Sequence, residues 1–157
     1  MTPTIQGAAR AIAARTLSLV ELTQRLLARI RAQDGTLHAF TEVAQARALS
    51  DARATEARAM AGTLRGPLDG IPIAHKDIFA TVGIATTGCS RQLAGWLPRG
   101  DAAAVAGLAA AGTVLLGKLA SPATRRAVDK AVQVFRGLGA EVREASLPVL
   151  ADFEACG

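Results

Sequence analysis

The sequence predicts an α/β fold in which a helical N-terminal region precedes helix–strand units that form a mixed or partly parallel sheet. Before residue 62, apolar residues recur at helical spacing. After residue 70, short apolar stretches of strand length alternate with helical stretches. Half of the 157 residues are hydrophobic, so the chain is long enough and apolar enough to bury a core.

The N-terminal region contains two predicted helices. Residues 4–14 form a short one, with Ile5, Ala9 and Ile12 on one face. Ser18 and Glu21 form a capping-box pattern, in which each side chain satisfies an unpaired backbone N–H, so a longer helix begins after Ser18. Its core-facing residues recur at helical spacing and are Leu19, Leu22, Leu26 and Ile30.

The middle of the chain continues with a short extended segment at residues 39–43 and a helix at 44–61 that ends at Gly62. Residues 71–76 predict a short strand, and Pro72 places it at a sheet edge or at the beginning of the strand, because proline donates no ladder hydrogen bond.

Residues 79–100 predict an ordered loop, since they are rich in small and turn-forming residues. Asp101 is expected to cap a helix that ends at Gly112, and residues 113–117 to form a buried strand.

The last quarter of the chain repeats the predicted order of a helix followed by a strand. Ser121 supplies a cap, Gly139 ends the helix, and residues 140–147 form the next strand. We expect this helix to bury an apolar stripe of Val128, Ala131, Val132, Phe135 and Leu138.

Composition argues against several functional classes. The net charge of +5 comes largely from single Arg residues scattered among Ala, and aromatic residues make up only 3% of the chain. Nucleic-acid binding is therefore not expected, because both a dense basic patch and stacking platforms are missing.

Residues 102–117 are too short and too weakly apolar to span a membrane. Cys89 and Cys156 are far apart, and neither His38 nor His75 lies at ligand spacing, so we expect no disulfide, metal or other cofactor, and a cytoplasmic location.

The stretch GPLDGIPIAHKDIF, residues 66–79, resembles the N-terminal motif of the amidase signature family. The similarity continues through Thr86-Thr87-Gly88 and the stretch AAGTVLLGK that ends at Lys118, and it covers residues 16–119. Within this motif, the residue pattern His-Lys-Asp-Ile-Phe at 75–79 most resembles the branch of glutamine-hydrolysing tRNA amidotransferase A subunits. The resemblance implies a partial amidase-like fold and an amide hydrolase that converts an amide to a carboxylate and ammonia.

The resemblance breaks after residue 120. In the family, a Gly/Ser-rich segment follows and supplies two catalytic serines, whereas here Ala120 runs directly into Ser121-Pro122. We therefore interpret the chain as one truncated amidase-like domain. Residues 1–120 carry the N-terminal part of the pattern, and residues 121–157 resemble a later part joined after an internal deletion.

By its position in the motif, Lys76 matches the family's catalytic lysine, which takes a proton through a bridging serine while a second serine attacks the carbonyl. A proton-accepting lysine must be neutral, so we expect a buried setting. Neither serine can be assigned, and the Ser-Ser-Lys triad is therefore incomplete. Of the five serines, Ser18 and Ser121 are expected to cap helices, Ser50 to lie on a charged helix, Ser146 to be exposed near a strand end, and Ser90 to bond nearby backbone, although Ser90 could approach Lys76.

Three neighbouring residues receive structural interpretations. His75 projects opposite Lys76 on a strand, so it is not expected to share a proton-transfer role. Asp77 is expected to pair with a basic neighbour and fix the turn, and Cys89 to be packed and inert, with an exposed thiol as the alternative.

Two functions follow from these observations. The first is an amidase-signature hydrolase that acts on a small-molecule amide when complete and is inactive as this chain alone. The alternative is a non-catalytic amidase-like protein that associates with itself or docks on a relative, because deleting strands from a sheet leaves unpaired edges.

Overall fold

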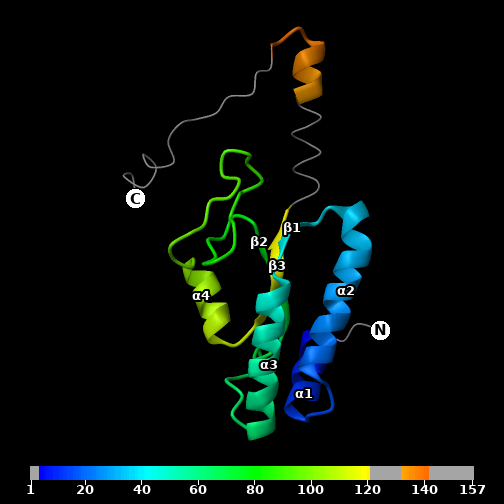
Figure 1. Ribbon diagram of the computed structural model, residues 1–157, viewed down its shortest axis with the longest axis vertical. Coiled ribbons are helices and arrows are strands. Elements are labelled where there is room, and N and C mark those ends of the chain that lie inside the picture. The colour runs from blue at the N-terminus through cyan, green and yellow to red at the C-terminus, as the bar shows by residue number, and fades with distance from the viewer. Residues whose placement is uncertain (1–3, 121–131, 142–157) are drawn as a thin grey trace.

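The computed structural model describes residues 4–120 and 132–141, and its elements follow the predicted order. Figure 1 shows three N-terminal helices beside a small sheet, with the fourth helix and the long loop on the other side of the third helix. Residues 132–137 are also helical. The labelled elements are α1 Ile5–Ala13, α2 Leu19–Leu37, β1 Phe40–Val43, α3 Gln45–Ala61, β2 Pro72–Lys76, α4 Ala103–Ala110 and β3 Val114–Leu119.

The three strands form a mixed sheet in the order β1-β3-β2. β1 pairs with β3 in antiparallel orientation, and β2 pairs with β3 in parallel orientation. The central strand, β3, is buried from Val114 to Lys118. Pro72 stands at the first position of an edge strand, where its missing N–H costs no ladder hydrogen bond. The predicted α/β class with a partly parallel sheet is confirmed.

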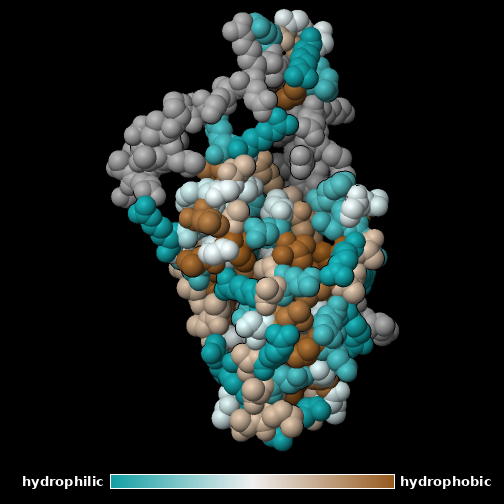
Figure 2. Space-filling model, viewed as in Figure 1, coloured by the Kyte–Doolittle hydropathy of each residue, from teal (hydrophilic) through white to brown (hydrophobic). Residues whose placement is uncertain are grey.

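The core lies where α1, α2 and α3 pack against the sheet (Figure 1). α3 presents small side chains to this core, and Ala48 and Ala52 are fully buried, so the helix can approach β3 closely. On the face seen in Figure 2, apolar residues form separate patches among hydrophilic ones. The buried hydrophobic cluster consists of Ala8, Ile12, Leu19, Leu27, Ala48, Ala52, Ala59, Ile71, Val114 and Leu116.

The beginning of α2 confirms half of the predicted capping box. Ser18 Oγ accepts a hydrogen bond from the Glu21 N–H at 3.3 Å. The carboxylate that meets this helix end comes from Glu56 on α3 and not from Glu21. Its Oε1 accepts from the Leu19 N–H at 3.1 Å and from the Ser18 hydroxyl at 2.7 Å. A bond across 37 residues thus replaces the local one and joins α2 to α3.

The predicted cap at Asp101 is wrong. α4 begins after Ala102, and no side chain of the described residues caps it. Asp101 Oδ1 instead accepts a hydrogen bond from the Val82 N–H at 2.7 Å, which fastens the end of the predicted loop to its beginning. The loop is further closed by the Thr86 N–H, which donates to the Trp96 carbonyl at 3.0 Å. Residues 79–100 are therefore an ordered loop, as predicted.

The predictions for residues 121–147 agree with the structure only in part. Residues 132–137 are helical, and Gly139 follows with a positive φ of 82°, as expected for a residue that ends a helix. The predicted burial of the apolar stripe is wrong for Phe135 and Leu138, which are 56% and 77% exposed. These side chains lack the sheet face that the pattern presupposes. The cap at Ser121 and residues 142–147 of the predicted strand lie outside the described residues.

Candidate active site

Lys76 is the last residue of β2, where it lies opposite Leu119 of the neighbouring parallel strand. Its side chain is exposed, so the described residues do not provide the buried setting expected from the sequence. Within the described residues, no hydrogen bond or ion pair joins its amino group to another side chain. In the described structure, Lys76 therefore lies at the carboxyl end of an edge strand with an exposed side chain.

A second lysine, Lys118 on β3, lies in the opposite environment. It is fully buried and is in register with His75 of β2. Its Nζ donates hydrogen bonds to the Phe79 carbonyl and the Thr86 hydroxyl, each at 2.7 Å, and lies 3.5 Å from Asp77 Oδ1. Three acceptors thus surround an ammonium group that has three N–H donors.

This environment gives Lys118 a structural role. Burial lowers the pKa of Lys118 below its ordinary value, while the charge and hydrogen bonding of Asp77 act in the opposite direction. Each N–H of the ammonium form has an acceptor, and the acceptors belong to the turn and loop that follow β2. Lys118 therefore fastens this loop to the central strand. Sequence reasoning missed it, although a lysine inside the apolar stretch VLLGKL was the available signal.

Asp77 fixes the turn after Lys76, as predicted. Its carboxylate accepts hydrogen bonds from the Thr87 N–H at 3.2 Å and from the Thr87 hydroxyl at 2.5 Å, besides pairing with Lys118. Its backbone N–H donates to the Leu119 carbonyl at 3.0 Å, and its carbonyl accepts from the Gly88 N–H at 2.8 Å. The residue next to Lys76 is therefore bound on both its backbone and its side chain.

His75 lies on the other side of β2 from Lys76, as strand alternation predicts. It is only 7% exposed, and both ring nitrogens lack a hydrogen-bond partner among the described residues. Burial lowers the pKa of His75, and the positive charges of Lys118 and Arg47 act in the same direction. A neutral imidazole facing away from Lys76 is not placed to exchange a proton with it.

The described serines have local partners or exposed positions. Ser18 caps α2, and Ser50 is exposed on α3, both as predicted. Ser90 Oγ accepts a hydrogen bond from the Gln92 N–H at 3.3 Å, which confirms its bonding to nearby backbone. Ser121 and Ser146 lie outside the described residues.

Cys89 is exposed, so the prediction of a packed thiol is wrong and the alternative holds. Its φ of 62° lies in the left-handed region, and its N–H donates to the Thr87 hydroxyl at 3.1 Å. In the described part of the chain, no group of three or more His, Cys, Asp or Glu residues is arranged to hold a metal ion. None of the helices described there is long and apolar enough to cross a membrane.

A family comparison identifies the motif around Lys76. Residues 21–123 match the amidase family. The chain belongs to this family. The match includes the Lys76 strand, the loop that follows it and β3, so the geometry described above is that of a family segment.

Individual relatives agree with this assignment. The A subunit of glutamyl-tRNA(Gln) amidotransferase from Anaeromyxobacter sp. (strain K) is 50% identical over 115 residues, which are 73% of this chain and 23% of that protein. The native peptide amidase of Stenotrophomonas maltophilia is 37% identical, with a TM-score of 0.69 over 73% of this chain and 24% of its own. A protein from a vestigial complex, whose structure reveals the origins of an s-triazine catabolic enzyme, is 37% identical with a TM-score of 0.67, over 71% of this chain and 25% of that one. The chain thus spans about a quarter of the length of the relatives it matches.

Proposed function

We propose that this chain carries the lysine-bearing segment of an amide hydrolase, with Lys76 as the residue that accepts the nucleophile's proton, and that the chain alone does not hydrolyse amides. The observation that supports this most directly is the contrast between Lys76 and its surroundings. The amine is exposed at the end of β2, while the adjacent Asp77 is held by Lys118 and Thr87. A bound turn fixes the position of the amine, as a proton acceptor requires, and the burial that would make the amine neutral has to come from outside the described residues.

The missing part of the reaction is the nucleophile. Amide hydrolysis needs a group that attacks the carbonyl, a proton acceptor and donors for the developing oxyanion. In the described residues, Ser18, Ser50 and Ser90 have structural positions. We infer that a complete protein supplies the two serines from a segment that covers Lys76. Burial of an amine disfavours its charged form, so such a cover would also prepare Lys76 to accept a proton.

The organisation of the chain follows from the same proposal. Residues 1–120 form the N-terminal part of the family pattern, and residues 121–157 correspond to a later part joined near Ala120 and Ser121. The family match, which ends at residue 123, supports the first half of this arrangement. Sequencing the gene and transcript across this junction tests it. A longer reading frame with a Gly/Ser-rich segment would support an internal deletion, and an uninterrupted junction in independent isolates would exclude a cloning artefact.

A segment exchange tests the role of Lys76 directly. Residues 21–119 of this chain replace the matching segment of the S. maltophilia peptide amidase, and ammonia release from a peptide amide is measured. We expect an active chimera that loses at least about 100-fold in rate when Lys76→Ala is introduced, because a positioned proton acceptor contributes on that scale. Arg53→Gln, an exposed change on α3, is the matched control and should leave the rate unchanged.

Two results would contradict the proposal. One is a chimera whose Lys76→Ala variant, folded by circular dichroism, keeps its rate. The other is amide hydrolysis by the 157-residue chain alone that disappears with Lys76→Ala, since this would mean that a nucleophile is already present.

A non-catalytic role is the second candidate, supported by a free strand edge and by exposed apolar residues in the loop after β2. β2 has no neighbour on its outer side among the described strands, and Ile78, Val82 and Leu97 are 59%, 45% and 59% exposed. Such surfaces favour association with a second copy or with a relative. One structural relative comes from a protein complex. Sedimentation would decide, since a stable monomer at all concentrations counts against self-association.

We also propose a cytoplasmic location, because the relatives of this branch act on a tRNA-linked substrate by name.

A further inference from the structure

The outer edge of β2 is a row of backbone groups that no other strand of the described structure covers. Along a strand, the backbone groups of successive residues point alternately to its two neighbours. The Ile71 carbonyl and the Asp77 N–H both bond to β3, each at 3.0 Å, so the odd-numbered residues face β3. The register shift between the two strands adds a residue to β3, so the alternation along β2 is unbroken. The outward-facing backbone groups are those of Pro72, Ala74 and Lys76.

These outward groups form a short set of donors and acceptors. Ala74 contributes an N–H and a carbonyl, Pro72 contributes a carbonyl but no N–H, and Lys76 contributes an N–H. The Lys76 carbonyl is already bonded, because it accepts from the Phe79 N–H at 3.1 Å. Within the described residues, no hydrogen bond occupies the other four groups. An edge with unpaired groups of this kind can take up a strand from another chain.

A second copy of the same edge matches these groups in one register. When two β2 strands run antiparallel with Ala74 opposite Ala74, each Ala74 N–H meets the Ala74 carbonyl of the other copy. Pro72 then lies opposite Lys76, so the Lys76 N–H meets the Pro72 carbonyl. The donor that proline lacks falls opposite the Lys76 carbonyl, which the Phe79 N–H already satisfies. Each of the four free groups of one copy thus meets one of the other copy.

Other registers break this match. A shift by two residues in one direction places Ala74 opposite Pro72, so an Ala74 carbonyl faces a residue without an N–H. A shift by two in the other direction places Ala74 opposite Lys76, so an Ala74 N–H faces a carbonyl that is already bonded. A shift by one residue sets outward groups against groups that bond to β3. The edge therefore favours a single antiparallel register.

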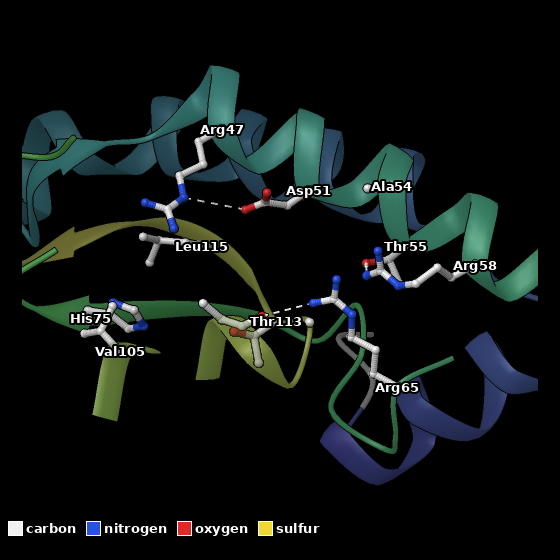
Figure 3. Close-up of a pocket in the computed structure, with 12 residues that line it drawn as sticks. Arg47, Asp51, Ala54, Thr55, Arg58, Arg65, His75, Val105, Thr113 and Leu115 are labelled. Carbon is white, nitrogen blue, oxygen red and sulfur yellow. Dashed lines mark hydrogen bonds and ion pairs between the residues drawn. The ribbon is translucent and has the colours of Figure 1, made fainter. Parts of the chain in front are cut away.

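The side chains of β2 permit the same arrangement. In this register the Cα atoms of the two Lys76 residues lie about 14 Å apart, since four residues separate them along the strands at about 3.4 Å per residue. That separation exceeds the screening length of about 10 Å at 0.1 M salt, so the two ammonium groups repel each other weakly. His75 lines a polar cavity between α3, α4, β2 and β3 (Figure 3), so its ring is turned to one face of the sheet and leaves the edge open.

We propose that two copies of this chain associate through their β2 strands, paired in antiparallel orientation about a two-fold axis at Ala74. The pairing joins the two sheets into one, in the order β1-β3-β2-β2-β3-β1. A two-fold contact uses the same surface on both copies, so it closes at a dimer. This pairing makes specific the association on which the second candidate function rests, and it does not depend on the proton-accepting role of Lys76.

Sedimentation equilibrium of the full 157-residue chain tests the pairing. We expect a weak dimer with a Kd below about 1 mM, because a contact between two short strands buries less surface than a standard interface. Ala74→Pro removes the central donor from both copies and should weaken dimerisation at least about tenfold. Proline is tolerated on an edge strand where the N–H faces outward, so the protomer should still fold, which circular dichroism checks. Ala74→Ser keeps the N–H and nearly the same size, and should leave the Kd unchanged.

Disulfide formation tests the register, in a chain whose two cysteines are replaced by Cys89→Ser and Cys156→Ser. A hydrogen-bonded antiparallel pair places its Cα atoms about 5.5 Å apart, which is within the range of a disulfide. Ala74→Cys should therefore cross-link two copies in a glutathione buffer. Lys76→Cys is the matched control on the same edge and should not cross-link, because its two Cα atoms would be about 14 Å apart.

Three results would overturn the proposal. The first is a monomer at all concentrations up to about 1 mM, which would mean that water or another segment of the same chain covers the edge. The second is a dimer that a folded Ala74→Pro variant does not weaken, since association through another surface would keep the second candidate function and remove this pairing. The third is equal cross-linking of Ala74→Cys and Lys76→Cys. If Ala74→Pro does not fold, the two cysteine variants decide, and the role of Lys76 is measured separately in the chimera.

Discussion

Lys118→Met tests whether the buried lysine holds the loop after Lys76. Methionine fills a similar volume, so the substitution removes the charge and the three donors while disturbing the packing little. It leaves Asp77, which is 1% exposed, without a counter-charge, and it leaves the Phe79 carbonyl and the Thr86 hydroxyl without their donor. The cost therefore comes from groups that stay buried after the lysine is gone.

The size of the effect follows from the geometry. At the 3.5 Å separation of Lys118 Nζ and Asp77 Oδ1, two unit charges attract by about 5 kcal/mol at an effective dielectric constant of about 20. Breaking a buried pair by removing one partner costs about 3–5 kcal/mol. Asp77 keeps its hydrogen bonds from Thr87, so we expect the free energy of unfolding to fall by about 3 kcal/mol. A domain is stable by about 5–15 kcal/mol, so the loss is readily measured.

Urea unfolding supplies the assay, with two probes. Trp96 is the single tryptophan and lies in the loop, so its fluorescence reports the loop, while far-ultraviolet circular dichroism reports the helices. Lys76→Met is the matched control and should change the free energy of unfolding by less than about 0.5 kcal/mol, because Lys76 is exposed. In the double variant with Asp77→Asn, the loss should be smaller than the sum of the two single losses. A loss for Lys118→Met no larger than that of Lys76→Met, or strict additivity, would refute the assigned role.

Two further predictions concern Gly112, between α4 and β3, and Asp69, which precedes β2. Gly112→Ala should destabilise the protein by more than about 1 kcal/mol in thermal melts, because Gly112 has a φ of 85° and a Cβ there would collide with the Asp69 carboxylate. Gly35→Ala is the control. A Cβ at Gly35, within α2, has free space, so this change should be neutral or stabilising. Burial raises the pKa of Asp69, but hydrogen bonds from Arg58, the Arg65 N–H and Thr55 outweigh it and hold the pKa below its usual value. The stability that Asp69 contributes is therefore present above about pH 4 and is lost as the pH falls through its folded-state pKa, so urea melts from about pH 7 to about pH 3 should show Asp69→Asn weaker at neutral pH and converging on the unchanged chain in acid. Parallel pH profiles for the two proteins would contradict this.

The features that sequence predicted well are those determined within a few residues. Ser18 accepts an N–H three residues along the chain, and Gly62 ends α3 with a positive φ of 71°. Asp77 fixes a turn whose partner, Thr87, lies ten residues away in an ordered loop. Such interactions leave a readable pattern because both partners occur in one short stretch.

The features that sequence missed depend on distant partners. Glu56 replaces Glu21 at the beginning of α2 because α3 packs beside that helix end. Asp101 bonds to a residue 19 positions earlier, although the same side chain before a helix favours a cap. Lys118 directly follows the predicted strand of residues 113–117, and its burial depends on three acceptors 32 to 41 positions away. Tertiary contacts decided each of these cases, and local propensity carries no information about them.

A segment of about a quarter of its relatives' length can hold Lys76 in a defined position. The position of Lys76 depends on its neighbours, because Asp77 is bonded to Leu119, Gly88 and Thr87, and Lys118 joins the loop to β3. All of these contacts lie between residues 76 and 119, within the family match. The lysine can therefore be held in place before any nucleophile is present, and the segment exchange measures whether that placement is accurate enough for catalysis. A folded chimera without activity would mean that the contacts preserve the turn but not the position of the amine.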